Sequence, residues 1–482
     1  MRPARLLCSG LGLSLLLCLS VGCGGEGPDL ARQTGPRDIV LIVVDTLRAD
    51  HLGAYGYSRR TSPILDALAA SGTLFTNATA TSSWTRPSMA SLFTARLPSE
   101  LGLRTTTDVL DPAWPTLAER LQKSGYRTVG VSGNFVHISE PSGFARGFDP
   151  FVPVAIRASE SSDMLFERLD AETGYVPIPL RAPTALELNE RVFATLDRLD
   201  DSAARPLFLY VHYMDPHSGY LPPAGYARKF AGDGGGPVAN SDYLLDIAAG
   251  RRTADAAEKK RLTALYDGEI AFVDAQIGLL LSGLEERNLA GEAVVIVVSD
   301  HGEEFTEHGG WFHGLTLHRE LLHVPLIVQD RRSREAARQR DEPVDLVDVA
   351  VTVLALAGLA DESGSSGRDL LAAAALPPRV RIAELEHDRL REERVTAVRH
   401  RRAVTAWPWK AIVDAEGAIA AYRIDRDPGE KLPLSLDDPE VPAPLRARAR
   451  RLAVEAAETG IGPVPDLSRE DRAALRALGY AD

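Results

Sequence analysis

The sequence has almost no cysteine. Of its 482 residues only three are cysteines, and all three lie within the first 23 positions. If that segment is removed or modified, the rest of the chain contains neither a disulfide nor a thiolate metal site. No apolar run in the sequence reaches the roughly 20 residues that a membrane-spanning helix requires.

Positive charge is also scarce. The chain has 54 basic and 67 acidic residues, which give a formal net charge of −13. Binding to nucleic acid usually requires a basic face, so we expect no nucleic-acid partner. The composition, 45% hydrophobic and 25% charged, is typical of a globular protein. A chain of this length predicts one large domain and a smaller one.

The N-terminus has the pattern of an export signal. Two arginines precede an apolar stretch from Leu6 to Leu19, and small residues then lead to Cys23. This pattern resembles a bacterial lipobox, although Ser20 replaces the usual leucine. We predict a signal peptide at 1–22, a lipid on Cys23 and a linker at 23–36, with an ordinary signal peptide as the alternative. The protein would then be an envelope lipoprotein, facing the periplasm or attached to the outer membrane, that contacts the membrane only through its lipid.

The rest of the chain alternates between predicted strands and helices. Apolar, β-branched runs such as 37–45 and 293–300 are typical of strands buried on both faces of a parallel sheet. Segment 62–72 begins with Ser-Pro and ends with Gly, as helices often do. We predict an α/β fold over 37–360, with a large, mostly parallel mixed sheet flanked by helices. A small C-terminal α+β subdomain of short strands and a helical tail should occupy 361–482.

Two of the predicted strands end in acidic residues. Asp45 follows the first strand, and Asp300 follows a later one and is itself followed by His301. In open α/β sheets, ligands bind beyond the carboxyl ends of the strands. An ionised carboxylate directly after a buried strand is costly unless it is paired or binds a metal. Either acid alone could be a turn residue, but together with His301 they favour a metal site.

A hydroxyl residue, Thr85, stands two positions before Pro87 and the helical segment 88–94. This spacing places its Oγ near the N-terminus of a helix, which favours an anionic ester. Thr85 can therefore be a nucleophile, an N-cap, or both.

Seven of the 11 histidines lie between residues 212 and 323. Many stand in predicted loops, where packing in a core does not explain them, and imidazole can ligate a metal or transfer protons near neutral pH. We predict His217 or His313 as the general acid and His308 as a substrate-binding residue, whereas His318 and His323 favour structural roles. The seven are His212, His217, His301, His308, His313, His318 and His323.

Taken in order, these segments resemble the sulfatase family within the alkaline-phosphatase superfamily. The resemblance extends over about 37–434 and rests on VVDTLRADHLGAYGY, TRPSMASLFTARLP, HYMDPHSGY, SDHGEEFTEHG, DLVDVAVTVLALAG and YRIDRDPGE. It implies an alkaline-phosphatase-like fold and metal binding by Asp45, Asp300 and His301. It also implies that Thr85 is both metal-bound and nucleophilic.

The sequence departs from that family at the nucleophile. Sulfatases of the usual kind convert the first residue of Cys/Ser-x-Pro-x-Arg to formylglycine, whereas this segment reads TRPSM and starts at Thr85. Threonine has one hydroxyl, so an ester formed on it must be displaced by water or another acceptor, as in the phosphodiesterase and phosphotransferase branches. Arg86 could bind the anionic ester or be a surface residue. Asn134 replaces a substrate-binding lysine, whose role His313 could take.

The first metal motif also differs, because Thr46 follows Asp45 where relatives often have a second Asp. Fewer acids together with His301 favour Zn²⁺ or Mn²⁺ over Ca²⁺, which prefers oxygen ligands. The sequence thus predicts a metal-dependent hydrolase of sulfate or phosphate esters, acting on small-molecule, glycan or lipid substrates. The alternatives are a phosphodiesterase or phosphotransferase acting on envelope lipids or glycans, and a catalytically silent lipoprotein that binds anions or glycans.

Overall fold

The computed structural model describes residues 37–459 with short interruptions, and these residues belong to one unit of the chain, Pro36–Asp482. The predicted signal peptide, Cys23 and the linker lie outside the described residues. The interruptions fall at 106–107, 158–164, 171–173, 200–204, 234–240, 249–250, 290, 333–336, 362–363, 373–375 and 392–393.

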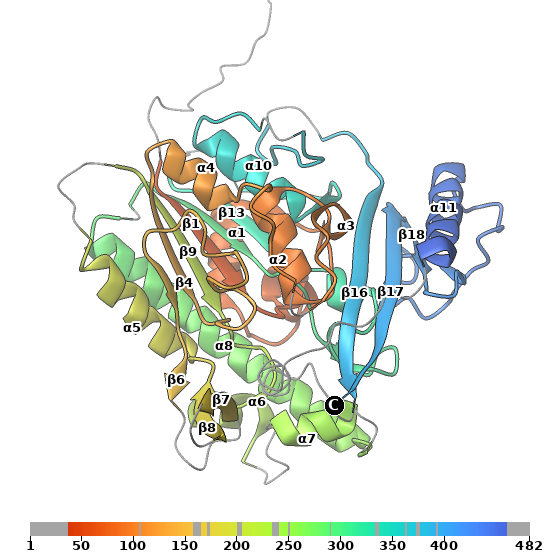
Figure 1. Cartoon of the computed structure of the whole chain (residues 1–482), viewed down its shortest axis with the longest axis horizontal. Coiled ribbons are helices and arrows are strands. Elements are labelled where there is room, and N and C mark those ends of the chain that lie inside the picture. The colour runs from red at the N-terminus through yellow and green to blue at the C-terminus, as the bar shows by residue number, and fades with distance from the viewer. Residues whose placement is uncertain are drawn as a thin grey trace, which may run out of the picture. The chain divides into compact units, whose positions relative to one another are not determined.

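An eight-stranded mixed sheet forms the centre of the large domain (Figure 1). Its parallel strands, in spatial order, are β10 (Val294–Val298), β1 (Ile39–Val44), β9 (Leu207–Tyr213), β4 (Arg127–Ser132) and β5 (Phe151–Pro153). Beyond β10 the sheet continues with β13 (Leu326–Asp330), which runs antiparallel to β10, and then with β2 (Thr73–Phe75) and β14 (Arg338–Arg340), which both run antiparallel to β13. Every residue of β1, β4, β9 and β10 is buried, as expected for strands covered on both faces.

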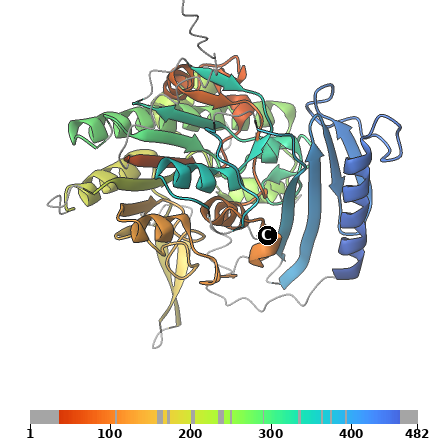
Figure 2. The same ribbon diagram turned by 90° about the horizontal axis from the view of Figure 1, so that it is seen from above.

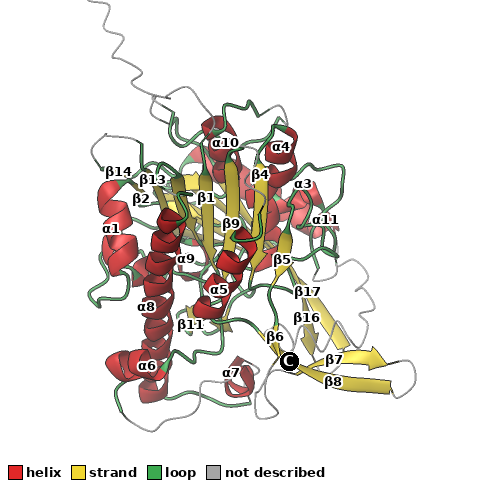
Figure 3. Cartoon of the chain, turned by 90° about the vertical axis from the view of Figure 1, so that its left-hand side faces the viewer, coloured by secondary structure: helices red, strands yellow, loops and turns green. Residues whose placement is uncertain are grey.

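Helices cover both faces of this sheet (Figure 3). Along β1, Ile39, Leu41 and Val43 enter one apolar core, while the alternating residues enter the other, because successive side chains of a strand point to opposite faces. The first core includes residues of α2 (Thr85–Thr94), α4 (Leu117–Lys123) and α10 (Val347–Leu356). The second includes residues of α1 (Pro63–Ser71), α5 (Ala185–Leu196) and α8 (Ala256–Glu286).

The predicted helix boundaries hold at α1, which starts at Pro63 after Ser62 and ends before Gly72. Helix α8 starts at Ala256, because Asp255 in the cap position accepts hydrogen bonds from the first-turn amides. Within the described part of the chain, none of the helices combines the length and apolarity needed to cross a bilayer.

The C-terminal subdomain is a four-stranded antiparallel sheet with one helix packed against it (Figure 2). Its elements are β16 (Arg381–Arg391), β17 (Arg394–Ala406), β18 (Trp409–Val413), β19 (Ile419–Arg423) and α11 (Ala443–Thr459). Strands were predicted here, but β16 and β17 are 11 and 13 residues long rather than short, because they pair along their whole length. Ala383 and Leu385 of β16 enter the core of the large domain, so the sheet lies between that domain and α11.

The remaining elements are short connections and hairpins. They are β3 (Ala78–Thr79), α3 (Pro98–Leu101), β6 (Ile156–Arg157), β7 (Leu165–Asp170), β8 (Gly174–Arg181), α6 (Ala224–Ala231), α7 (Ser241–Ala248), β11 (Glu304–Phe305), β12 (Trp311–Phe312), α9 (Arg319–Leu322) and β15 (Val344–Asp345).

Candidate functional site

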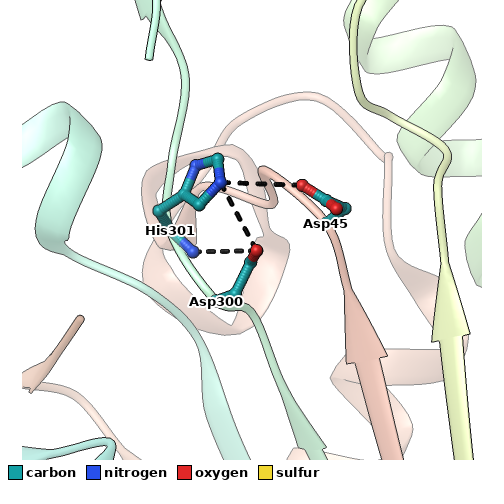
Figure 4. A group of neighbouring side chains, drawn as sticks. All are labelled: Asp45, Asp300 and His301. Carbon is teal, nitrogen blue, oxygen red and sulfur yellow. Dashed lines mark hydrogen bonds and ion pairs between the residues drawn. The ribbon is translucent and has the colours of Figure 1, made fainter. Parts of the chain in front are cut away.

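Asp45, Asp300 and His301 lie together at the carboxyl edge of the parallel sheet (Figure 4). Strands β1 and β10 are adjacent and parallel, so the residues that follow them meet at one edge. The Nε2 atom of His301 lies 3.7 Å from Oδ1 of Asp45 and 3.4 Å from Oδ2 of Asp300. One ligand atom from each residue lies within 4.8 Å of the others, and all three side chains are fully buried. The structure therefore brings together the three residues that the sequence indicated.

The turn after Asp45 is held in an unfavourable backbone conformation. Thr46 has a φ of 56°, a left-handed value that is rare for a β-branched residue. The hydroxyl of Tyr266 in α8 donates to the carbonyl of Thr46 (2.7 Å) and accepts from the amide of Arg48 (3.1 Å). The amide of Thr46 in turn lies 3.3 Å from Oδ1 of Asp300 and donates to it. Strained backbone of this kind persists where the surroundings hold it, often at functional sites.

One oxygen of each acid has hydrogen-bond donors, and the other does not. Oδ2 of Asp45 accepts from Nδ2 of Asn134 (2.9 Å) and from Nε2 of His212 (3.1 Å). Oδ1 of Asp45 and Oδ2 of Asp300 are buried and have no donor among the residues that the structure describes. Leaving a buried carboxylate oxygen unsatisfied is costly, whereas a cation satisfies both oxygens at once. This donor set therefore fits a divalent metal.

Neighbouring groups fix which nitrogen of each imidazole faces the acids. Nδ1 of His301 donates to the carbonyl of Gly302 (2.9 Å), which leaves the lone pair of Nε2 directed toward the two acids. The hydroxyl of Tyr210 donates to Nδ1 of His212 (2.7 Å), so the Nε2–H of His212 is the donor to Asp45. Such partners orient metal ligands and their supporting groups.

The group carries an excess of negative charge. Burial and the charge of Asp45 raise the pKa of Asp300 to about 6. Burial also acts to raise the pKa of Asp45, but the hydrogen bond from His212 and the electrostatic effect of the nearby His217, His212 and His301 lower it overall. The pKa of His301 is raised despite burial, because the charges of Asp300 and Asp45 favour its cationic form. A cation is thus favoured in this position.

The N-terminus of helix α2 is directed at the group formed by Asp45, Asp300 and His301. The helix begins at Thr85, and the residue in the cap position is Trp84, so the expectation that Thr85 might be the N-cap is wrong. Oγ1 of Thr85 lies 3.3 Å from Nε2 of His301. The hydroxyl of Ser88, one turn along, donates to the carbonyl of Asp300 (2.6 Å) and joins the helix to the end of β10. Unpaired amides at a helix N-terminus stabilise negative charge.

Two further histidines line this region. The ring of His313 lies with its centroid 4.5 Å from that of His301 and 5.0 Å from that of His217. Nδ1 of His313 lies 2.8 Å from Oε1 of Glu303, which orients the ring and places Nε2 on the side away from Glu303. Burial raises the pKa of Glu303 to about 7, although the charges of His217 and His301 oppose this. The structure thus places both predicted general-acid candidates near the candidate metal ligands.

Arg86 does not lie on the surface, so that expectation is wrong. Its side chain is buried, and Nη1 donates to the carbonyl of Asp108 (2.8 Å), which fixes the loop that follows α3. Asn134 donates a hydrogen bond to Asp45 and therefore lies at the site, whereas its role in binding substrate stays a prediction.

His308 lies in a different cluster from the one expected. Its Nδ1 lies 2.6 Å from Oε1 of Glu320, and its Nε2 lies 3.0 Å from the carbonyl of Glu430. The ring also stacks on His318, with centroids 3.4 Å apart. Because both ring nitrogens are engaged by protein atoms, the contacts do not support the prediction that His308 binds substrate.

Two residues of the site were given no role from the sequence. His212 pairs in register with Val43 of β1, and a histidine near the carboxyl end of a parallel strand next to an Asp-terminated strand is the signal that could have found it. Glu303 stands two positions after His301, but the local sequence does not show that it turns back to contact His313.

Comparison with known proteins finds a family profile and several related sequences that match this chain. A profile of the sulfatase family matches residues 37–359. The chain is 26% identical to human (Homo sapiens) iduronate 2-sulfatase over an alignment of 425 residues, which covers 74% of this chain and 76% of that protein. It is 30% identical to arylsulfatase A of Bos taurus over 331 residues, which covers 62% of this chain and 57% of that protein.

Two similar solved structures confirm the fold. One is a protein in complex with its substrate D-glucosamine-2-N,6-O-disulfate; its TM-score is 0.68 at 18% identity, with 88% of this chain and 98% of that chain covered. The other is the phosphonate monoester hydrolase of Agrobacterium radiobacter, with a TM-score of 0.67 at 19% identity and coverage of 88% and 96%. At these identities the similarity establishes the architecture, so the predicted α/β fold with a small C-terminal subdomain is confirmed.

Proposed function

The chain belongs to the sulfatase family, and on that premise we propose that it is a metal-dependent hydrolase of sulfate or phosphate esters with Thr85 as its nucleophile. The position of Thr85 Oγ1 carries the proposal, because it is buried at the first residue of α2 and lies 3.3 Å from Nε2 of His301. Nucleophile, helix N-terminus and metal ligands then meet at one point, where an ester group is attacked and stabilised.

Four residues would hold the metal: Asp45, Asp300, His301 and Thr85 itself. A divalent metal bound there lowers the pKa of a coordinated hydroxyl and stabilises negative charge on the ester oxygens. A set that contains an imidazole nitrogen favours Zn²⁺ or Mn²⁺, because Ca²⁺ prefers oxygen ligands throughout.

The protein's own groups carry the two steps of the reaction. Oγ1 of Thr85 gives up its proton to solvent water and forms a bond to sulfur or phosphorus, while the bond to the leaving oxygen breaks. His313 or His217 donates the proton that the leaving oxygen takes up, and Glu303 holds His313 in orientation for this transfer. The amides at the start of α2 stabilise the charge on the ester oxygens. Water or an acceptor hydroxyl then displaces the ester from Thr85 and restores its hydroxyl.

The single hydroxyl of Thr85 bears on the choice of substrate. A nucleophile with one hydroxyl cannot expel sulfate by itself, so the ester on Thr85 must be displaced from outside, which suits phosphate or phosphonate esters and transfer to an acceptor. Similar proteins include sulfatases and a phosphonate monoester hydrolase. The second candidate function is therefore a phosphodiesterase or phosphotransferase that acts on envelope lipids or glycans.

Turnover on matched aryl esters tests the proposal. The purified protein, supplied with Mn²⁺ or Zn²⁺, is assayed on a phosphomonoester, a phosphodiester, a phosphonate monoester and a sulfate ester with the same aryl leaving group. Activity that requires Thr85 on one of these identifies the ester class. Activity that survives Thr85→Ala contradicts the nucleophile. A protein that binds metal and sulfated glycan but turns over no ester would be the silent binding protein instead.

We also propose that the protein is exported and carries a lipid on Cys23. The support is the N-terminal pattern of arginines, apolar residues and small residues before Cys23. Expressed in a diderm host, the protein should fractionate with membranes and incorporate labelled fatty acid. The variant Cys23→Ser should do neither, and membrane association of that variant would contradict the proposal.

A further inference from the structure

A second charged cluster lies where the C-terminal sheet meets the large domain. Lys410 of β18 places Nζ 2.8 and 3.0 Å from the two carboxylate oxygens of Glu430, which follows β19. Nδ1 of His318 and the backbone amide of Arg319, at the start of α9, each lie 3.0 Å from Oε2 of Glu430. Lys410 and Glu430 are only 3% and 1% exposed, so they form a buried ion pair whose charges cancel.

The positive charges of two arginines beside this pair are not neutralised by a carboxylate in the same way. Arg381, the first residue of β16, is 3% exposed, and its Nη1 donates to the carbonyls of Asn77 and Val344 and to the hydroxyl of Thr79. Its Nε has no acceptor in the described part of the chain. Arg319 is half-buried, and its Nη2 lies 3.4 Å from Nε2 of His323. Neither arginine forms an ion pair with a carboxylate of the described residues.

A small cavity of about 20 Å³ lies between these groups. Its polar wall includes Arg319, Arg381, Lys410, His323, Thr405 and Glu430. Three of these are cations and one is a carboxylate, while burial lowers the pKa of His323 to about 3 and keeps it neutral. The wall therefore carries two positive charges in excess. A cavity larger than about 10–15 Å³ has room for one water-sized particle.

The carboxylates farther away each have a nearer partner than these three cations. Glu320 acts on Lys410 but pairs with His308. Asp50 acts on Arg319 and His323 from a distance but forms its ion pair with Arg48, which it shares with Glu307. Asp345 acts on Arg381 but forms its ion pair with Arg379. Burial lowers the pKa of Arg381 to about 10, which reflects a buried guanidinium without a carboxylate beside it. Uncompensated buried charge of this kind is costly.

We propose that this cavity binds a single small monatomic anion, chloride, between Arg319, Arg381 and Lys410. The excess positive charge of the wall calls for an anion, and a cavity of about 20 Å³ suits a monatomic one. The anion joins β16 and β18 of the C-terminal sheet to α9 of the large domain and stabilises the contact between them.

Bromide, which replaces chloride and scatters X-rays anomalously, tests the proposal directly. Crystals of the wild-type protein grown in sodium bromide should show an anomalous peak in the cavity between Arg319 and Arg381. A water in the cavity without an anomalous signal, or bromide peaks on the molecular surface only, overturns the proposal. This measurement needs no variant, so a variant that fails to fold does not affect it.

Thermal unfolding provides the matched test in solution. At constant ionic strength, replacing sodium gluconate by sodium chloride should raise the midpoint of the wild-type protein by about 1–3 °C, because the anion binds the folded state only. Arg319→Gln should lose this rise. The control Arg120→Gln removes another partly buried arginine, one paired with Asp361, and should keep it. An equal chloride response in wild type and Arg319→Gln overturns the proposal.

Discussion

Two buried clusters of acids and histidines in this protein differ in charge balance. The first cluster, the candidate metal group, consists of Asp45, Asp300 and His301. In it, Oδ1 of Asp45 and Oδ2 of Asp300 have no hydrogen-bond donor among the described residues. In the cluster at the C-terminal sheet, the carboxylate of Glu430 accepts from Lys410 and His318 and from the backbone of Arg319. The first group has excess negative charge, and the second has excess positive charge.

This difference in charge balance indicates which kind of ion each cluster suits, which composition alone does not. His308 and His313 both follow Asp300 within the same loop, and both lie beside a glutamate. One ring is engaged through both nitrogens in holding the C-terminal sheet, whereas the other faces the metal group.

Replacing the nucleophile should have the largest effect. Thr85→Ala should lower kcat by at least about 10³-fold, because no other hydroxyl replaces the one that forms the covalent ester. Its melting temperature should stay close to that of the wild type. Ser91→Ala removes another buried hydroxyl from the same helix and should keep its activity. Activity of Thr85→Ala equal to that of Ser91→Ala would contradict the role of Thr85 as the nucleophile.

Removing the metal ligands comes next. Asp300→Asn should bind far less Zn²⁺ or Mn²⁺ than the wild type, measured by elemental analysis after dialysis, and should lower kcat by about 10² or more. Chelation of the wild type should give the same loss, reversed by Zn²⁺ or Mn²⁺ better than by Ca²⁺. Full metal content in Asp300→Asn would place the metal elsewhere.

The raised pKa of Asp300 predicts that the stability of the metal-free protein depends on pH. The pKa of Asp300 rises from 3.8 to about 6 on folding, so the folded state binds the proton more tightly than the unfolded state. The free energy of unfolding should therefore fall as pH rises from about 4 to about 6, and the loss persists above that range. A bound metal replaces the proton, so the gap between the melting temperatures of loaded and chelated protein should widen from pH 5 to pH 7. A constant gap would contradict this.

Replacing the proposed general acid should have an intermediate effect on kcat. His313→Gln should lower kcat by about 10² or more on aryl esters with poor leaving groups, and by less on esters with good ones, because a good leaving group needs no proton. His217→Gln, tested in parallel, decides which of the two histidines donates it. A loss that is independent of the leaving group for both variants would assign them to positioning instead.

The smallest effect on catalysis is expected at the structural cluster. His308→Gln should leave kcat/KM almost unchanged but lower the free energy of unfolding by about 1–3 kcal/mol, since Glu320 is left buried without its partner. Comparison of activity and melting temperature with those of His313→Gln checks this. A loss of activity as large as that of His313→Gln would restore His308 as a substrate-binding residue.

The fold was predictable because its signals are local. Strands β1 and β10 are runs of buried residues that end at Asp45 and Asp300, and the position of an acid after such a strand follows from the sequence alone. Parallel pairing then brings the strand ends together, so the main ligand candidates follow from topology. The confirmed architecture rests on these features.

The rest of the site depends on contacts between residues far apart in sequence. His308 contacts Glu430, which is 122 positions away, and no local pattern distinguishes this from a contact with substrate. His212 reaches Asp45 only because β9 pairs with β1 in a particular register. The length of β16 and β17 likewise depends on their pairing, since their residues are too polar to indicate long strands.

The most direct test of Thr85 as the nucleophile is to stop the reaction with acid during turnover and map the modified peptide by mass spectrometry. We predict that the peptide containing Thr85 carries a phosphoryl, phosphonyl or sulfuryl group, according to the substrate. This group should be absent without metal and absent in Thr85→Ala. Turnover with an unmodified Thr85, together with activity in Thr85→Ala, would contradict the proposed mechanism.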